Sequence, residues 1–180
     1  MFTTTVRLFA EYLTHVIDGG SLPRPNHNQT QRDLAVEVLE RLRQLNFIVG
    51  RVQKLEHGRG LVSYNEELDL ETRTLSEAFY YIGSRIRGIL NNGALPGLAS
   101  FECPGVRNVR NKLLEHPDGK DSGVLLQSFG YGGDSGPRIK ALRRVGQENT
   151  FPDAGLYGNA REFKEALEHL LLRTRENTGA

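Results

Sequence analysis

One short segment of the chain combines residue types that can act together on a phosphate group. Arg110 is followed directly by Asn111, and His116 comes six positions after the arginine. An arginine fork can hold a phosphate and offset the negative charge that grows on its oxygens. Histidine, with an unperturbed pKa of about 6.5, can accept or donate a proton near neutral pH, and Asn111 could orient either group. These three residues are therefore the candidate site.

The spacing of Arg110 and His116 can be compared with helix geometry. Six helical steps turn through about 600°, which leaves the two side chains roughly 120° apart and about 9 Å along the axis. They would not share one face of an ideal helix. Pro117 disfavours helical geometry at His116, so we expect the helix to end there and the imidazole ring to swing back. Because Arg110 has a long stem, the spacing allows both groups to reach one phosphate without requiring it.

This segment carries a family resemblance. Arg110 to His116 resembles the R-x(4–6)-H motif of HEPN domains, in which a polar residue such as Asn111 commonly follows the arginine. The resemblance is specific over Val106 to Pro117, and it extends as helical architecture over roughly Gln31 to Arg175. HEPN domains are small helical bundles, often dimeric, and many are metal-independent endoribonucleases of toxin–antitoxin, abortive-infection and CRISPR-linked systems. Others have lost catalysis and act as binding modules.

The resemblance implies a function for this chain. It implies that Arg110, Asn111 and His116 cleave RNA without a metal or other cofactor, through attack of a ribose 2′-hydroxyl, in toxin or phage-defence biology. The role of His116 as base, acid or phosphate clamp stays open, because a helix C-terminus favours protonated histidine. The alternative is a catalytically inactive HEPN-like interaction module or regulatory subunit. In that case Arg110 pairs with a carboxylate and His116 caps the last helical turn.

The same resemblance implies partners. One copy of the motif supplies one histidine, whereas in-line phosphoryl transfer needs both a base and an acid for the leaving group. A two-fold homodimer would bring Arg110 and His116 of both copies to one positively charged groove, lined by the Val106–Pro117 helix. We therefore expect an RNA substrate and a homodimer, and an antitoxin or another protein partner would fit the toxin role.

Basic residues outside the motif could extend the contact with RNA. Arg107 lies within the motif segment, and four more follow it in the second half of the chain: Arg138, Lys140, Arg143 and Arg144. Positive charge at these positions could follow a phosphate backbone. The alternative for each of them is an ordinary solvated polar face.

The composition excludes other classes of site. The formal net charge is +1, so no overall bias points to a nucleic-acid or membrane partner, although a local basic face stays open. The single cysteine, Cys103, excludes an intrachain disulfide framework and is expected to be a buried structural residue, which suits a cytoplasmic protein. No stretch approaches the roughly 20 apolar residues that a membrane helix needs. His15, His27, His57 and His169 lack the spacing of metal ligands, so no metal site is expected.

Apolar residues at spacings of three and four predict two amphipathic helices in the first third of the chain. The first covers Met1 to Gly20 and ends at its glycine pair. Its expected buried residues are Phe2, Val6, Phe9, Leu13 and Val16. The second keeps the same rhythm with Leu34, Val38, Leu42, Leu45, Val49 and Val52.

A loop is expected from Gly58 to Arg73, after which Thr74 to Glu77 matches a capping box that opens a third helix. The expected buried stripe of this helix is Leu75, Phe79, Ile82, Ile86 and Leu90. Asn91-Asn92-Gly93 should end it. The motif helix should then begin near Pro104, which is well tolerated in a first turn.

The pattern changes between Asp118 and Tyr157. Residues 124–129 and 137–142 read as two strands, with the glycine-rich residues 130–136 as their turn. A cap signal at Asn159 then opens a last helix with four apolar residues on one side: Phe163, Leu167, Leu170 and Leu171.

Together these elements predict one domain over residues 1–180. It comprises a leading helix at 1–20, core helices with the motif at 31–117, a hairpin insertion at 118–157 and a C-terminal helix at 159–175. The fold class is all-α or mainly α, specifically a HEPN-like helical bundle with a β-hairpin inserted between the last two core helices.

Overall fold

The computed structural model describes residues 1–19, 29–58, 66–114, 125–129, 138–143 and 147–178. The fold is mainly helical, as the sequence predicts. The helices are α1 (Thr3–Tyr12), the π-helical turn η1 (Leu13–Ile17), α2 (Gln29–Gly58), α3 (Glu66–Leu90), α4 (Pro104–Leu114) and α5 (Leu156–Thr178). The strands are β1 (Leu125–Phe129), β2 (Arg138–Arg143) and β3 (Gln147–Gly155).

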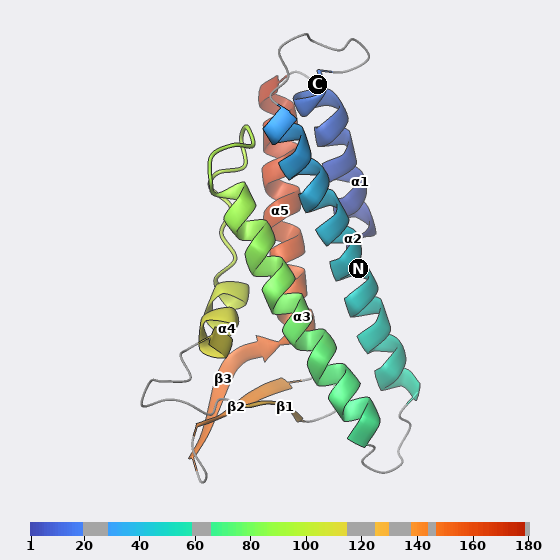
Figure 1. The fold of residues 1–180 in the computed structure, drawn as a ribbon, viewed down its shortest axis with the longest axis vertical. Helices are drawn as coiled ribbons and strands as arrows, with labels where there is room; N and C mark the ends of the chain where they lie inside the picture. The colour runs from blue at the N-terminus through green and yellow to red at the C-terminus, as the bar shows by residue number, and fades with distance from the viewer. Residues whose placement is uncertain (20–28, 59–65, 115–124, 130–137, 144–146, 179–180) are drawn as a thin grey trace.

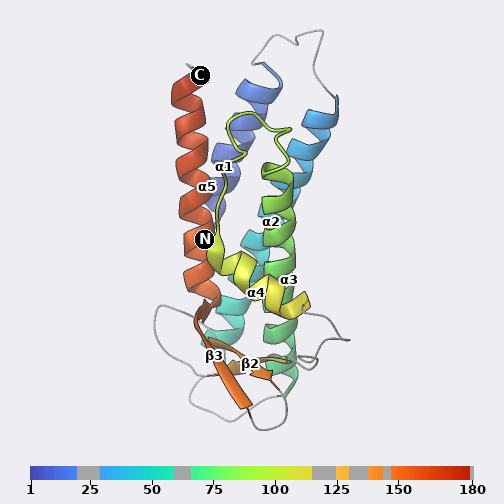
Figure 2. The same cartoon turned by 90° about the vertical axis from the view of Figure 1, so that its left-hand side faces the viewer.

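Four long helices run side by side, and the remaining elements gather toward one end of them. Helices α1, α2, α3 and α5 follow the long axis of the molecule, whereas the short α4 lies across it (Figures 1 and 2). The strands lie near the end of the bundle where α3 begins, and they contact α3, α4 and α5. Helix α4 therefore lies next to the strands, between them and the middle of the bundle.

Four phenylalanine rings meet in the core: one from the residue before α1, one each from α3 and α5, and one from the loop between α3 and α4. The ring of Phe2 lies 6.5 Å from that of Phe79 and 6.0 Å from that of Phe163, measured between centroids. Phe101, from the loop between α3 and α4, packs edge-on against Phe163 at 4.9 Å. All four side chains are fully buried, so this cluster joins the start of the chain to α3, the loop and α5.

Helices α1 and α5 are also joined by a polar contact across the core edge. The buried Thr5 hydroxyl donates to Oε1 of Glu168 at 2.7 Å, and Nζ of Lys164 donates to the other carboxylate oxygen at 2.9 Å. The carboxylate is thus satisfied on both oxygens, and a hydroxyl that would otherwise lose hydration on burial keeps a partner.

The leading helix differs from its prediction in its second half. Phe2 and Phe9 are buried as expected, but Leu13 and Val16 are only partly buried, and Tyr12 and Ile17 take the core positions instead. The cause is η1, because a π-helical turn holds more residues than an α-helical turn and so rotates the chain that follows it. The prediction of one continuous α-helical face was wrong here.

The predicted start of the third helix was also wrong. Helix α3 begins at Glu66, so residues 66–73 of the expected loop at 58–73 are helical. Thr74 therefore lies inside the helix. Its hydroxyl donates to the carbonyl oxygen of Leu70 at 2.9 Å, and that of Ser76 donates to Thr72 O at 2.7 Å. Hydroxyls bonded four residues back cannot act as caps. The buried stripe of Phe79, Ile86 and Leu90 is confirmed, and so is the end of α3 before Gly93, whose φ is 77°.

Helix α5 begins earlier than its predicted cap. It starts at Leu156, directly after β3, and Asn159 is a buried residue of the first turn rather than the residue before the helix. The expected apolar side of Phe163, Leu167, Leu170 and Leu171 is buried.

The segment predicted as a hairpin contains three strands in the order β1-β2-β3, all antiparallel. In the first pair Leu125 lies opposite Leu142, and Phe129 lies opposite Arg138. In the second pair Arg143 lies opposite Gln147, with a register shift between Arg138 and Lys140. The third strand was not predicted, and it runs directly into α5. Across the ranges that the structure describes, no helix has the length and apolar character to cross a membrane.

Candidate functional site

Arg110 and Asn111 of the motif lie on α4, the short helix that crosses the bundle. Arg107 is exposed and Arg110 is half-buried, and Asn111 is the next residue of the same helix. His116 lies outside the described residues, because the described part of α4 ends at Leu114. The structure therefore places two of the three candidate residues on one helix and leaves their distance from the histidine open.

The loop that leads into α4 is closed by a contact within itself and is held by two other elements, α1 and α5. The Asn91 carboxamide accepts from Phe101 N at 3.1 Å and donates to Phe101 O at 2.8 Å, which closes the loop at its base. The Tyr12 hydroxyl donates to Pro96 O at 3.0 Å. The Thr174 hydroxyl shares its proton between Leu170 O at 2.9 Å and Gly97 O at 3.3 Å. These bonds, together with the buried Phe101, fix the point from which α4 departs.

Each backbone amide in the first turn of α4 can be followed to a partner. Pro104 has none to donate. Gly105 N donates to Oε1 of Glu162 on α5 at 3.4 Å, and Arg107 N donates to Cys103 O at 3.1 Å. The amide of Val106 donates to the Cys103 sulfur. Helix starts leave such amides without intrahelical partners, and here a neighbouring helix and the preceding residue supply them.

Cys103 is thus the N-cap residue of α4. Burial, supported by the Glu162 carboxylate and opposed by the Val106 amide, raises the pKa of its thiol to about 12. The thiol stays protonated at neutral pH and is no nucleophile, because nucleophilic cysteines need the thiolate. The expectation of a buried cysteine is confirmed, and its capping contact was not foreseen.

Gly105 lets α4 approach α5 closely. A Cβ at this position would overlap Oδ1 of Asn159 and lie 2.7 Å from Oε2 of Glu162. The space in front of the helix start is therefore occupied by two polar side chains of α5. Asn159 in turn donates to the Tyr80 hydroxyl at 2.8 Å, and burial raises the pKa of Tyr80 well above its usual range.

A second glycine sets where α4 crosses α3. A Cβ at Gly83 would lie 3.1 Å from Cγ1 of Val106 and 3.5 Å from the ring of Phe163. Because Gly83 has no side chain, Val106 packs directly against the backbone of α3. The apolar side of α4, formed by Val106 and Val109, is buried here, and the side with Arg107 is left to solvent.

The basic residues of the insertion lie on a strand close to α4. Arg138, Lys140 and Arg143 belong to β2, which pairs with β3, and β3 contacts α4. Arg144 lies outside the described residues. The fold therefore carries the motif helix and three of the four additional basic positions on neighbouring elements in the same half of the molecule (Figure 2).

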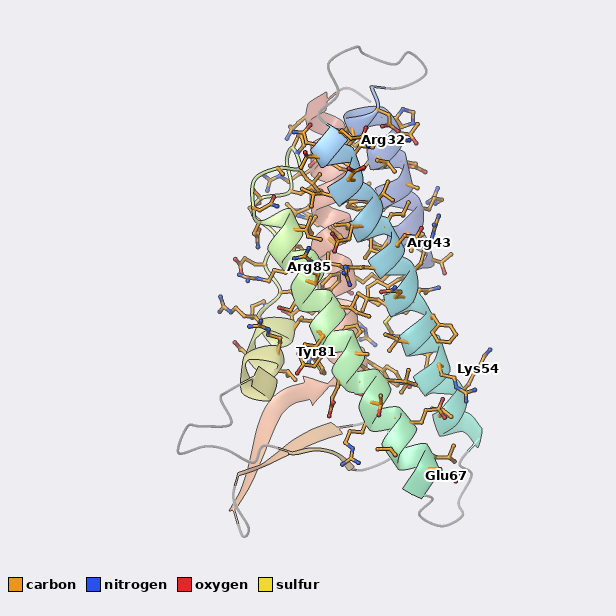
Figure 3. All side chains as sticks on the ribbon, viewed as in Figure 1. Arg32, Arg43, Lys54, Glu67, Tyr81 and Arg85 are labelled. Atoms are coloured by element: carbon orange, nitrogen blue, oxygen red, sulfur yellow. The ribbon has the colours of Figure 1, made fainter. Side chains whose placement is uncertain are left out.

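Arg85 of α3 has a structural role, because it pairs with a carboxylate of α2. Figure 3 shows Arg85 turned toward α2, where its Nε donates to Oε1 of Glu37 at 3.1 Å. Hydrogen bonds from Arg85 and then from Arg41 hold the pKa of the Glu37 carboxyl below its usual range. Arg85 therefore fastens α3 to α2.

Metal chemistry has no ligand set in the described ranges. No group of three histidine, cysteine, aspartate or glutamate side chains lies close enough there to hold an ion. His15 and His169 are exposed residues of η1 and α5.

Sequence reasoning missed Cys103, Gly105 and Glu162 as the residues that hold the motif helix. Gly105 and Glu162 are 57 positions apart, and nothing in the local pattern of either one indicates the other. Comparisons with protein families, curated proteins and solved structures found no match to this chain. The relation to HEPN domains therefore stays a prediction based on the motif.

Proposed function

We propose that this protein is a metal-independent endoribonuclease of the HEPN type, in which Arg110, Asn111 and His116 act on RNA. The observation that carries the proposal is the place of Arg107 and Arg110 on α4, a helix held by α5 at its start and lying beside the strands. A groove that follows a phosphate backbone needs positive charge from more than one element. Helix α4 and strand β2 both carry such charge in the same half of the molecule.

The chemistry follows from the residue types. A base removes the proton of a ribose 2′-hydroxyl, whose oxygen then attacks the adjacent phosphorus. The bond to the next nucleotide's 5′-oxygen breaks, and an acid returns a proton to that oxygen. The products are a cyclic 2′,3′-phosphate and a 5′-hydroxyl. Arg110 would neutralise the charge that grows on the phosphate oxygens, and His116 would hold or move the proton.

RNA degradation in the presence of EDTA tests this proposal. The purified protein is incubated with mixed RNA beside an Arg110→Ala/His116→Ala variant. The matched control is His169→Ala/Arg173→Ala, which removes the same residue types from exposed positions of α5. We expect the motif variant to lose at least about a hundredfold in cleavage rate, because acid–base catalysis alone contributes that much. The control should cleave like the unaltered protein.

The result that contradicts the proposal is equal RNA integrity with the unaltered protein and with the motif variant. It would favour the other role considered for this chain, a catalytically inactive interaction module or regulatory subunit. An antitoxin partner and a role in phage defence are proposals that follow only if RNA is cleaved.

A further inference from the structure

The start of α4 rests in a polar cradle, formed by Glu162 and Asn159 of α5. We propose that Glu162 is a positioning residue for the motif helix, because its carboxylate fixes the first turn of α4 and thereby sets where Arg107 and Arg110 meet a ligand. The link to RNA rests on the proposed function. The placement of the helix by Glu162 does not.

Glu162 and Asn159 leave room for the backbone of residue 105 but not for a side chain there. Oε1 of Glu162 accepts the Gly105 amide at 3.4 Å, and Oε2 would lie 2.7 Å from a Cβ of residue 105. Asn159 closes the other side and is itself held by the Tyr80 hydroxyl at 2.8 Å. A carboxylate at a helix start is also favoured by the partial positive charge of the helix dipole. Glu162 thus contributes both a directed hydrogen bond and a charge.

The contact of this first turn with the other neighbouring helix, α3, cannot fix its direction as well. Val106 packs against α3 at Gly83, but apolar contacts are not directional and would let the helix slide or rotate. Arg110 lies five residues beyond Gly105, which places it about 7.5 Å further along the axis. A small tilt of the first turn therefore displaces the guanidinium group of Arg110, because the helix acts as a lever of that length. A displacement of about 1 Å can cost a hundredfold in a catalysed rate.

Amide hydrogen exchange measured by NMR on the full chain tests the positioning directly. Glu162→Met keeps the length of the side chain and removes the acceptor, whereas Glu162→Gln keeps an acceptor. Glu165→Met is the matched control at an exposed position of the same helix. We expect exchange of the Gly105 amide to become about fivefold faster in Glu162→Met, the size expected for one lost hydrogen bond. In Glu162→Gln and Glu165→Met it should stay within about twofold of the unaltered protein.

Equal exchange rates in the Glu162→Met and Glu162→Gln proteins overturn the proposal. If Glu162→Met does not fold, the unaltered protein still decides, because a Gly105 amide that exchanges like a fully solvated one also overturns it.

Kinetics extend the test to the motif. We expect Glu162→Met to lower kcat for RNA cleavage about tenfold with little change in KM. Glu162→Gln should restore kcat, because it keeps the acceptor for the Gly105 amide although it lacks the charge. An unchanged kcat in Glu162→Met overturns the link between Glu162 and the motif. If the unaltered protein cleaves no RNA, the proposed function fails, while the exchange rates still decide whether Glu162 holds α4.

Discussion

Single residues around α4 act in two ways: glycines allow other side chains to approach the backbone closely, and polar side chains form hydrogen bonds with backbone groups. Gly105 admits two side chains of α5 to the start of α4, and Cys103 offers its sulfur to the amide of Val106. Gly97 has a φ of 75°, and because it has no side chain Thr174 can pack against it. The Thr174 hydroxyl lies 3.3 Å from the Gly97 carbonyl oxygen. These contacts hold the loop between α3 and α4, and thus the helix that carries the motif.

Replacement of Gly97 tests this at the residue scale. In Gly97→Ala the new Cβ would lie 2.5 Å from the Thr174 hydroxyl oxygen, and the backbone would be strained at a φ of 75°. We expect the free energy of unfolding to fall by about 1–3 kcal/mol in urea denaturation. Gly88→Ala is the control, because nothing lies within 4 Å of its Cβ position inside α3. It should stabilise the protein by roughly 0.5–1 kcal/mol. Equal effects of the two replacements would contradict the described geometry of the loop.

At the scale of elements, the start of α3 has a measurable consequence. If the helix began at Thr74 as a cap, Thr74→Ala would cost about 1 kcal/mol of stability. In the structure Thr74 is an exposed residue inside the helix, bonded to Leu70 O. Alanine has the higher helix propensity, so we expect Thr74→Ala to stabilise the protein by about 0.5 kcal/mol in the same denaturation experiment. A fall of about 1 kcal/mol or more in the free energy of unfolding would instead support Thr74 as the N-cap of the helix.

The contrast between predicted and observed elements has a common cause. Apolar periodicity predicted the buried faces of α2, α3 and α5, because apolar residues recur at helical spacing where one face of a helix packs on the core. It could not separate a threonine that caps a helix from one that bonds to the carbonyl four residues back, since both use the same side chain. Asn159 was misplaced for a related reason, because its partner Tyr80 lies 79 positions away.

The candidate site shows the same division. The motif residues Arg110 and Asn111 were found from their adjacency and types, and their helix was found from Pro104 and the apolar spacing. The residues that hold this helix were not found, because Glu162 contacts Gly105 only through the tertiary fold. A single sequence records local periodicity well and contacts between distant side chains hardly at all.

At the scale of the whole molecule, we expect two copies to associate through α4. A dimer would supply the second histidine that in-line transfer needs, and the exposed side of α4 with Arg107 would lie at the interface. Sedimentation should show a dimer at micromolar concentration. Arg107→Glu should weaken it by about tenfold, whereas Arg173→Glu, an equal charge change on α5, should not. A monomer at that concentration would contradict the prediction and weaken the nuclease proposal.

The pairing of α1 with α5 also has a consequence for how the protein is made. Thr5 and Glu168 bond across 163 positions of the chain, so α1 leaves the ribosome long before α5. Until α5 emerges, the apolar side of α1 with Phe2 and Phe9 lacks part of its partner surface. Until then the growing chain carries an amphipathic helix with part of its apolar side uncovered, a typical target for chaperones that bind nascent apolar segments. Helix α1 thus completes its packing only after α5 has been made.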